Sequence, residues 1–272
     1  MISEKIELLG KGLYGGSIPD ELTLTSIPTA SELDYVGSED FEATMLDKIL
    51  PSAVKEKINF RELLEIDFHW ICRCLRFLNY GPYYTTNATF CPDCGKASYG
   101  EFTVNLQTIG CKELPEGFKN ELVISKDEFI DFDGDIVIKL ATIQDIMNAY
   151  NDKAFVNDKG RIDKDLARMC YMIKSIKGKS NMTPIEIKLT IQKQLSSADY
   201  IILKNQVASL TDYGLRAGGS TQCPKCGSMN ATFIALVDDR FLRPTLGDLR
   251  EWKRSRSAGA TEKLPGDKTT AV

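Results

Sequence analysis

Two short segments decide how this chain is organised: Cys-Pro-Asp-Cys-Gly at residues 91–95 and Cys-Pro-Lys-Cys-Gly at residues 223–227. Each is a knuckle, a tight turn that aims two cysteine thiolates at one point. A structural zinc ion usually takes four such ligands in two pairs, so a single knuckle supplies half a site. Because the chain has two knuckles of one type, the sequence predicts a zinc site with Cys91, Cys94, Cys223 and Cys226 as ligands.

Each knuckle runs into an apolar segment that is typical of a β-strand: Phe102 to Val104 after the first and Thr232 to Ile234 after the second. A knuckle followed by a strand is the half-unit of a zinc ribbon. However, 128 residues lie between Cys94 and Cys223, far more than the roughly 15–20 of an ordinary four-cysteine motif. The sequence therefore predicts a split ribbon, in which the metal clasps two distant parts of the chain.

Other uses of the knuckles are possible. They can be surface turns with free thiols, or a redox Cys-x-x-Cys motif, but two matching knuckles in one chain disfavour both. Four cysteine ligands leave no open coordination position, so the site predicts a scaffold and not catalysis. The ligand type favours zinc, although iron can also occupy four thiolates.

The amino-acid composition disfavours several classes of protein function. The chain has 272 residues, of which 43% are hydrophobic, and a net charge of −4. This acidic balance disfavours a general nucleic-acid binder, which usually has a basic domain. No stretch reaches the roughly 20 apolar residues of a membrane span, and the first residues lack the pattern of a secretory signal. The cysteines outside the knuckles are expected to be buried small hydrophobes: Cys72, Cys74, Cys111 and Cys170.

The sequence contains few features that are typical of an enzyme. Its single histidine, His69, lies in a strong helical pattern, where a core or interface role is the usual one. There is no serine elbow and no glycine loop that cradles phosphate. We therefore predict a non-enzymatic protein with no catalytic residues and no cofactor site apart from the metal.

The first two segments of the chain are residues 1–58, an N-terminal arm and helix, and residues 59–140, a helix followed by the first half of the ribbon and a β-hairpin. Residues 1–38 read as one or two short strands, either an ordinary sheet edge or an arm on a neighbouring subunit. A helix is expected over 38–50, ended by Pro51, and a second from Asn59 to Gly81. The aromatic residues of this second helix suit core packing or a partner surface.

The remaining segments are a helical insert over residues 141–215, the second half of the ribbon over 216–252, and a disordered tail over 253–272. Helices in the insert are expected to begin at Thr142, Asp163, Thr183 and Ser197 or Asp199, with residues 174–179 as a solvated loop. Residues 131–135 resemble a calcium loop, but the twelfth position is not Glu, so a hairpin turn is expected. The predicted class is α+β: a split zinc-ribbon β-subdomain, a helical insert between its knuckles and an N-terminal strand and helix arm.

Five places between residues 8 and 244 carry a resemblance to a known family. They are the glycine-rich segment ending Leu24-Thr25-Ser26-Ile27-Pro28-Thr29, Ile49-Leu50-Pro51, Arg76-Phe77-Leu78-Asn79-Tyr80-Gly81, the first knuckle, and the run from Leu195-Ser196-Ser197-Ala198-Asp199-Tyr200 through Tyr213-Gly214 and the second knuckle to Phe241-Leu242-Arg243-Pro244. In the order of these places the chain resembles the baseplate hub and hub-assembly proteins of T-even-like contractile-tailed phages.

The resemblance implies a structural component or an assembly chaperone of the tail baseplate hub, with other hub proteins as partners and an oligomeric assembly. It implies a location in the virion tail baseplate, in the host cytoplasm during assembly, or both. The rival hypothesis is a zinc-ribbon protein that binds nucleic acid through basic residues beside Trp252: Arg240, Arg243, Arg250, Lys253, Arg254 and Arg256.

Overall fold

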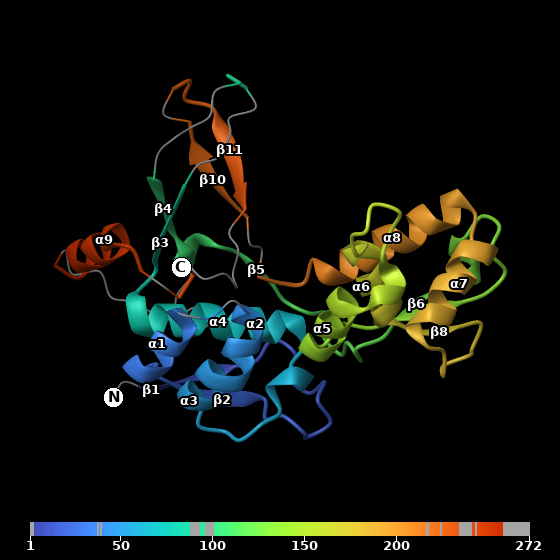
Figure 1. The fold of residues 1–272 in the computed structure, drawn as a ribbon, viewed down its shortest axis with the longest axis horizontal. Helices are drawn as coiled ribbons and strands as arrows, with labels where there is room; N and C mark the ends of the chain where they lie inside the picture. The colour runs from blue at the N-terminus through green and yellow to red at the C-terminus, as the bar shows by residue number, and fades with distance from the viewer. Residues whose placement is uncertain are drawn as a thin grey trace.

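The computed structural model describes residues 3–36, 38, 40–87, 93–95, 101–215, 218–223, 225–233, 241–242 and 244–257. They form an N-lobe, an insert lobe and an arm (Figure 1). The N-lobe contains β1 (Ser3–Glu7), β2 (Glu21–Thr25), α1 (Thr29–Val36), α2 (Phe41–Thr44), α3 (Leu50–Ala53), α4 (Glu65–Tyr80) and α9 (Leu246–Ser257). The arm contains β3 (Tyr83–Asn87), β4 (Glu101–Asn105), β10 (Gly218–Gln222) and β11 (Met229–Phe233).

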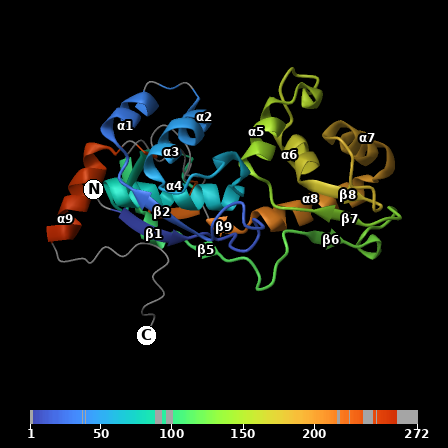
Figure 2. The same cartoon turned by 90° about the horizontal axis from the view of Figure 1, so that it is seen from below.

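The insert lobe lies beside the N-lobe (Figure 2). It contains β6 (Leu122–Ile124), β7 (Ile136–Ile138), α5 (Ile143–Asn151), α6 (Lys164–Met172), β8 (Ile173–Ile176), α7 (Pro184–Gln194) and α8 (Ser197–Thr211). Two short strands, β5 (Cys111–Lys112) and β9 (Gly214–Leu215), pair where the chain enters and leaves this lobe. The two lobes combine helices with small antiparallel sheets, and the described part of the arm consists of two antiparallel hairpins, which together confirm the α+β class.

The N-terminal strands form a hairpin that packs on its own chain. β1 and β2 pair antiparallel, and they bury Ile6 from one strand with Leu22 and Leu24 from the other. The backbone N–H of Lys55 donates to the carbonyl oxygen of Thr23 at 3.0 Å and so covers part of the outer edge of β2. Residues 1–38 also include α1, a helix that the glycine-rich sequence did not predict.

The helix expected over 38–50 is a composite. α2 begins at its cap Asp40 and passes through a π-helical turn, Met45–Ile49, into α3. Pro51 was predicted to follow the end of the helix but lies in the first turn of α3.

The central helix α4 is shorter than predicted at its start. Asn59 caps a separate 3-10 turn, Phe60–Glu62, and the extended backbone of Leu64 then leads into the helix. Its end at Gly81 is as predicted, with a φ of 76° that glycine adopts without strain. The aromatic residues of this segment are all buried, so they serve core packing: Phe60, Phe68, Trp70 and Phe77.

The insert is not all helical, contrary to the prediction. The helix capped by Asp163 ends at Met172, and residues 173–176 form β8, the third strand of the sheet β6-β7-β8. Ile173 and Ile176 enter the core while Lys174 stays exposed, which is why this stretch reads as a solvated loop. The predicted caps Thr142 and Thr183 are confirmed, and α8 is capped one residue early, by Ser196.

The chain does not become disordered at residue 253, because α9 continues to Ser257; the remaining residues of the predicted tail lie outside the described part. Asp248 and Thr245 cap the helix reciprocally, at 2.8 and 3.1 Å. α9 docks through an ion pair between Asp248 and Arg76 of α4 at 2.9 Å. The indole of Trp252 lies over Gly81, where a Cβ would meet the ring at 2.5 Å.

Candidate metal centre

The arm brings the two knuckles together. The hairpins β3–β4 and β10–β11 project side by side from the N-lobe, and the knuckles lie toward their far end (Figure 1). β4 follows the first knuckle and β11 follows the second, as the sequence predicts. Segments that are more than a hundred residues apart thus meet at one place.

The second knuckle has the backbone of a closed turn. The N–H of Gly227 donates to the carbonyl oxygen of Cys223 at 2.9 Å, and the N–H of Cys223 donates to that of Ser228 at 2.8 Å. Gly227 has a φ of 77°, and Gly95 has a φ of 63° at the equivalent position of the first knuckle. Both positions require the left-handed backbone that glycine adopts readily, which explains the final glycine of each motif.

Three of the four predicted ligands converge. The Sγ atoms of Cys94, Cys223 and Cys226 all lie within 4.8 Å of one another, and those of Cys94 and Cys223 are 4.0 Å apart. A Zn–S bond of about 2.3 Å in tetrahedral geometry puts sulfur atoms roughly 3.8 Å apart, so the set fits a metal ion of this kind. Cys91, the fourth predicted ligand, lies outside the described residues.

The three cysteines differ in their exposure. Cys223 is buried, Cys94 is half-buried and Cys226 is exposed. The Sγ of Cys226 lies 2.6 Å from the hydroxyl of Ser228. One edge of the sulfur cluster therefore faces solvent, while the opposite edge is packed into the arm.

The remaining described cysteines lie outside the sulfur cluster of the arm. Cys72, Cys74 and Cys170 are buried, as predicted, and Cys111 is half-buried on β5. Burial raises the pKa of the Cys72 thiol, and it raises the pKa of the Cys74 and Cys170 thiols to about 12. None of these four cysteines belongs to the group of converging sulfur atoms found among the described residues.

His69 is not part of the candidate metal site. It is half-buried on α4, and burial lowers its pKa, against the influence of Glu65, so the ring is neutral at pH 7. Among the described residues, the cysteine cluster of the arm is the one group of three or more His, Cys, Asp or Glu side chains arranged to hold a metal.

The base of the arm has a second junction between the two halves of the chain, which sequence reasoning missed. The guanidinium of Arg76 is fully buried; besides the ion pair to Asp248 it donates to the carbonyl oxygens of Phe241 and Tyr83, each at 2.7 Å. It also lies 5.4 Å from the ring centroid of Tyr80. A signal was present: arginine within an apolar helix needs a partner when it is buried.

A third buried group fixes the N-terminal hairpin to α4. The carboxylate of Asp67 accepts from the N–H of Leu9 at 2.6 Å, from the N–H of Gly10 at 3.1 Å and from the hydroxyl of Tyr14. Burial raises the pKa of Asp67 to about 6, even though these hydrogen bonds act in the opposite direction. A Cβ on Gly10 would lie 2.6 Å from this carboxylate and 2.7 Å from Leu64.

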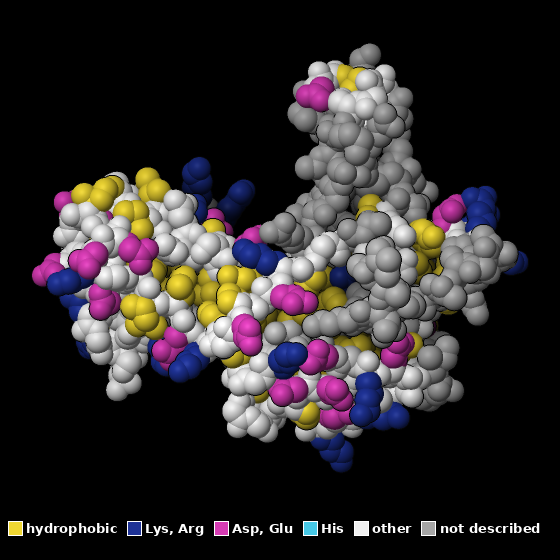
Figure 3. Space-filling view, turned by 180° about the vertical axis from the view of Figure 1, so that it is seen from behind, with side chains coloured by type: hydrophobic (Ala, Val, Ile, Leu, Met, Phe, Trp, Pro, Cys, Tyr) yellow, Lys and Arg dark blue, Asp and Glu magenta, His cyan; other side chains and the backbone are white. Residues whose placement is uncertain are grey.

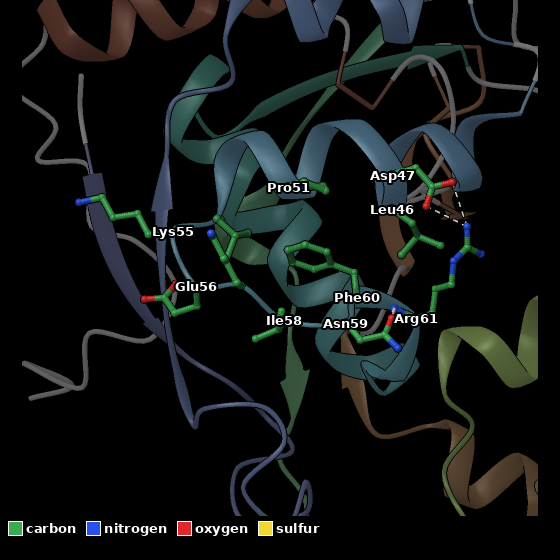
Figure 4. Close-up of a pocket in the computed structure, with 11 residues that line it drawn as sticks. Leu46, Asp47, Pro51, Lys55, Glu56, Ile58, Asn59, Phe60 and Arg61 are labelled. Atoms are coloured by element: carbon green, nitrogen blue, oxygen red, sulfur yellow. Dashed lines mark hydrogen bonds and ion pairs between the residues drawn. The ribbon is translucent and has the colours of Figure 1, made fainter.

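A groove of about 460 Å³ opens between the helical run 41–53 and the segment 54–61 (Figure 4). Leu46 and Phe60 form its apolar floor, and Arg61 closes one end by binding both carboxylate oxygens of Asp47, at 2.8 and 2.9 Å. The guanidinium of Arg61 is thereby engaged within the chain, so it does not mark this groove as an anion site.

On the face shown in Figure 3, lysine and arginine side chains are interspersed with aspartate and glutamate, without a continuous basic surface. Within the part of the chain that the structure describes, none of the helices combines the length and apolar character needed to cross a membrane. Comparisons with protein families, with curated proteins and with solved structures each give no match to this chain.

Proposed function

We propose that the chain is a non-enzymatic structural or assembly protein of a contractile-phage baseplate hub, in which a structural zinc ion holds the arm together. The convergence of Cys94, Cys223 and Cys226 from two distant segments carries the metal part of this proposal. The order of segments that resembles the hub family supports the rest.

Cys91 completes the proposed ligand set. Four thiolates saturate a tetrahedral zinc ion, which then acts as a cross-link and leaves no position for water or substrate. This chemistry suits a scaffold whose arm must keep a fixed shape. Cys94 and Cys223 hold the inner edge of the site, and Cys226 closes it on the solvent side.

Native mass spectrometry of the purified chain tests the metal. We expect one zinc ion per chain, lost on denaturation and absent from Cys226→Ser. Cys111→Ser is the matched control, because Cys111 is a half-buried cysteine outside the cluster and its replacement leaves the zinc content unchanged. Full zinc content in Cys226→Ser contradicts the ligand assignment.

Co-expression with the hub proteins encoded in the same genome tests the assembly role. We expect the chain to elute with at least one of them as a complex of defined mass. If it forms no such complex and instead binds DNA or RNA with steep salt dependence, the nucleic-acid hypothesis replaces this one. The nucleic-acid hypothesis included Trp252 beside the basic residues, but the indole of Trp252 packs on Gly81 within the chain.

A further inference from the structure

A pocket of about 220 Å³ lies on the N-lobe, away from the metal centre, where α1 and the end of α4 meet Leu242 and Pro244. Its wall is mainly apolar and includes Ile27, Ile49 and Leu242, all buried, with Leu33 exposed at the rim. The wall is assembled from segments far apart in sequence. Its C-terminal part is held in place by the bond from Arg76 to the carbonyl oxygen of Phe241.

The side chain of Tyr80 forms part of the buried wall of this pocket. It lines the pocket and is only 8% exposed. Its buried hydroxyl makes no hydrogen bond to any described residue. Native proteins rarely leave a buried hydroxyl unpaired, because the lost contact with water is not replaced. This hydroxyl has no surface open to the pocket, so an acceptor atom of a ligand has no room beside it, and Tyr80 contributes only its ring to the pocket wall.

Glu32 gives the pocket a negative charge. It lies on α1 at the pocket and is half-buried, and burial raises its pKa. Its carboxylate makes no ion pair or hydrogen bond within the described residues, unlike Glu65 and Glu121, which pair with Arg168 and Lys174. A partly desolvated carboxylate without a counter-ion favours a basic group in a ligand.

The volume selects the kind of ligand. Sites for cofactors and drug-sized molecules span roughly 300–1,000 Å³, so this pocket is too small for them. It has the size of one large side chain, and such anchors filling apolar pockets dominate the energetics of protein interfaces.

We propose that this pocket receives one aromatic or branched aliphatic side chain of a partner protein. The same partner segment carries a basic residue that faces Glu32. The inference rests on the proposed role in a protein assembly, but it involves no residue of the metal centre.

Tryptamine and indole-3-acetate, which share a ring and differ in charge, are the probes. They are titrated into the full chain and followed by methyl NMR of isoleucine and leucine. Tryptamine is expected to shift Ile27, Ile49 and Leu33 and to bind several-fold more tightly than indole-3-acetate. Glu32→Gln should remove this preference.

Glu42→Gln is the matched control, since Glu42 on α2 is also half-buried with a raised pKa but does not line the pocket. Equal binding of both probes, shifts elsewhere in the chain, or unchanged binding in Glu32→Gln overturns the charge assignment and with it the proposal.

Selection from a random peptide library on the immobilised chain tests the partner class. We expect enriched peptides to combine an aromatic or branched aliphatic residue with a nearby lysine or arginine and to lose binding to Glu32→Lys. No enriched motif, or a motif indifferent to that substitution, overturns a protein partner. If peptides bind but no hub protein does, the pocket proposal is supported and the proposed function is contradicted. If a hub protein binds but no peptide does, the proposed function is supported and the pocket proposal is contradicted.

Discussion

The tip of the arm and its base join the same two halves of the chain by different chemistry. At the tip, three thiols from two segments converge where a metal can cross-link them. At the base, the buried ion pair between Arg76 and Asp248 does the same without any ligand. The tip is partly open to solvent, whereas both side chains of the base pair are at most 1% exposed. The metal is therefore expected to hold the arm, and the buried charges to hold the lobes.

Arg76→Met should have the largest effect on the N-lobe. It leaves the carboxylate of Asp248 buried without its counter-ion, and breaking such pairs typically costs about 3–5 kcal/mol. The free energy of unfolding, measured by urea denaturation, should fall by that amount. Arg61→Met is the control, because Arg61 and Asp47 are partly exposed and such pairs contribute less than about 1 kcal/mol. Equal losses in the two variants would show that burial of the base pair does not matter.

Asp67→Asn should change how stability depends on pH. Unfolded aspartate has a pKa of about 3.9, whereas burial raises that of Asp67 to about 6. Between these values the folded chain keeps a proton that the unfolded chain releases, so this contribution stabilises the fold at acidic pH and is lost as pH rises through about 6. The free energy of unfolding of wild type should fall between pH 4 and 7 by roughly 3 kcal/mol because of this group, and the variant should lack that fall. Asp133→Asn, at an exposed position, should leave it unchanged.

Gly10→Ala should have a moderate effect at the same junction. The added methyl group meets the carboxylate of Asp67 and the side chain of Leu64, and overpacking of this kind costs about 1–3 kcal/mol. Gly110→Ala serves as the control because a Cβ there has no atom within 4 Å. The melting temperatures of the two variants should therefore separate, and a Gly10→Ala protein as stable as wild type would mean that the hairpin is loosely held.

Cys226→Ser should have the smallest effect on the lobes, although it is expected to remove the metal. Hydrogen exchange should accelerate in β3, β4, β10 and β11, while α4 keeps its protection. The lobes are expected to lose less than about 1 kcal/mol, since surface changes away from a core usually stay in this range. Faster exchange in α4 as well would show that the tip also stabilises the lobes, which contradicts the expectation that the metal holds only the arm.

The tip could be predicted from the sequence and the base could not. The knuckles can be recognised from the spacing of their cysteines and from the glycine that follows, since Gly95 and Gly227 both adopt the left-handed backbone conformation. Local signals also located Thr142 and Thr183 as caps and Gly81 as a helix end. Such features depend on neighbouring residues, so a single sequence contains them.

The misread elements depend on distant partners. β8 is a strand because β7 lies beside it, and its lysine and serine give no strand signal on their own. α9 has the polar composition of a tail, and its order follows from Asp248 reaching Arg76 and Trp252 reaching Gly81. The pocket beside Tyr80 is built from three separate segments, so no local pattern marks it.

The pairing of β5 with β9 has a consequence for how the two knuckles meet. Lys112 and Gly214 face each other as antiparallel partners, so the chain leaves for the insert lobe and returns at adjacent positions. A short turn between them would close an uninterrupted hairpin and leave both knuckles and the base ion pair in one continuous chain. The long gap between the two knuckles in sequence therefore adds no distance between them in space, because residues 113–213 leave and return at one strand pair.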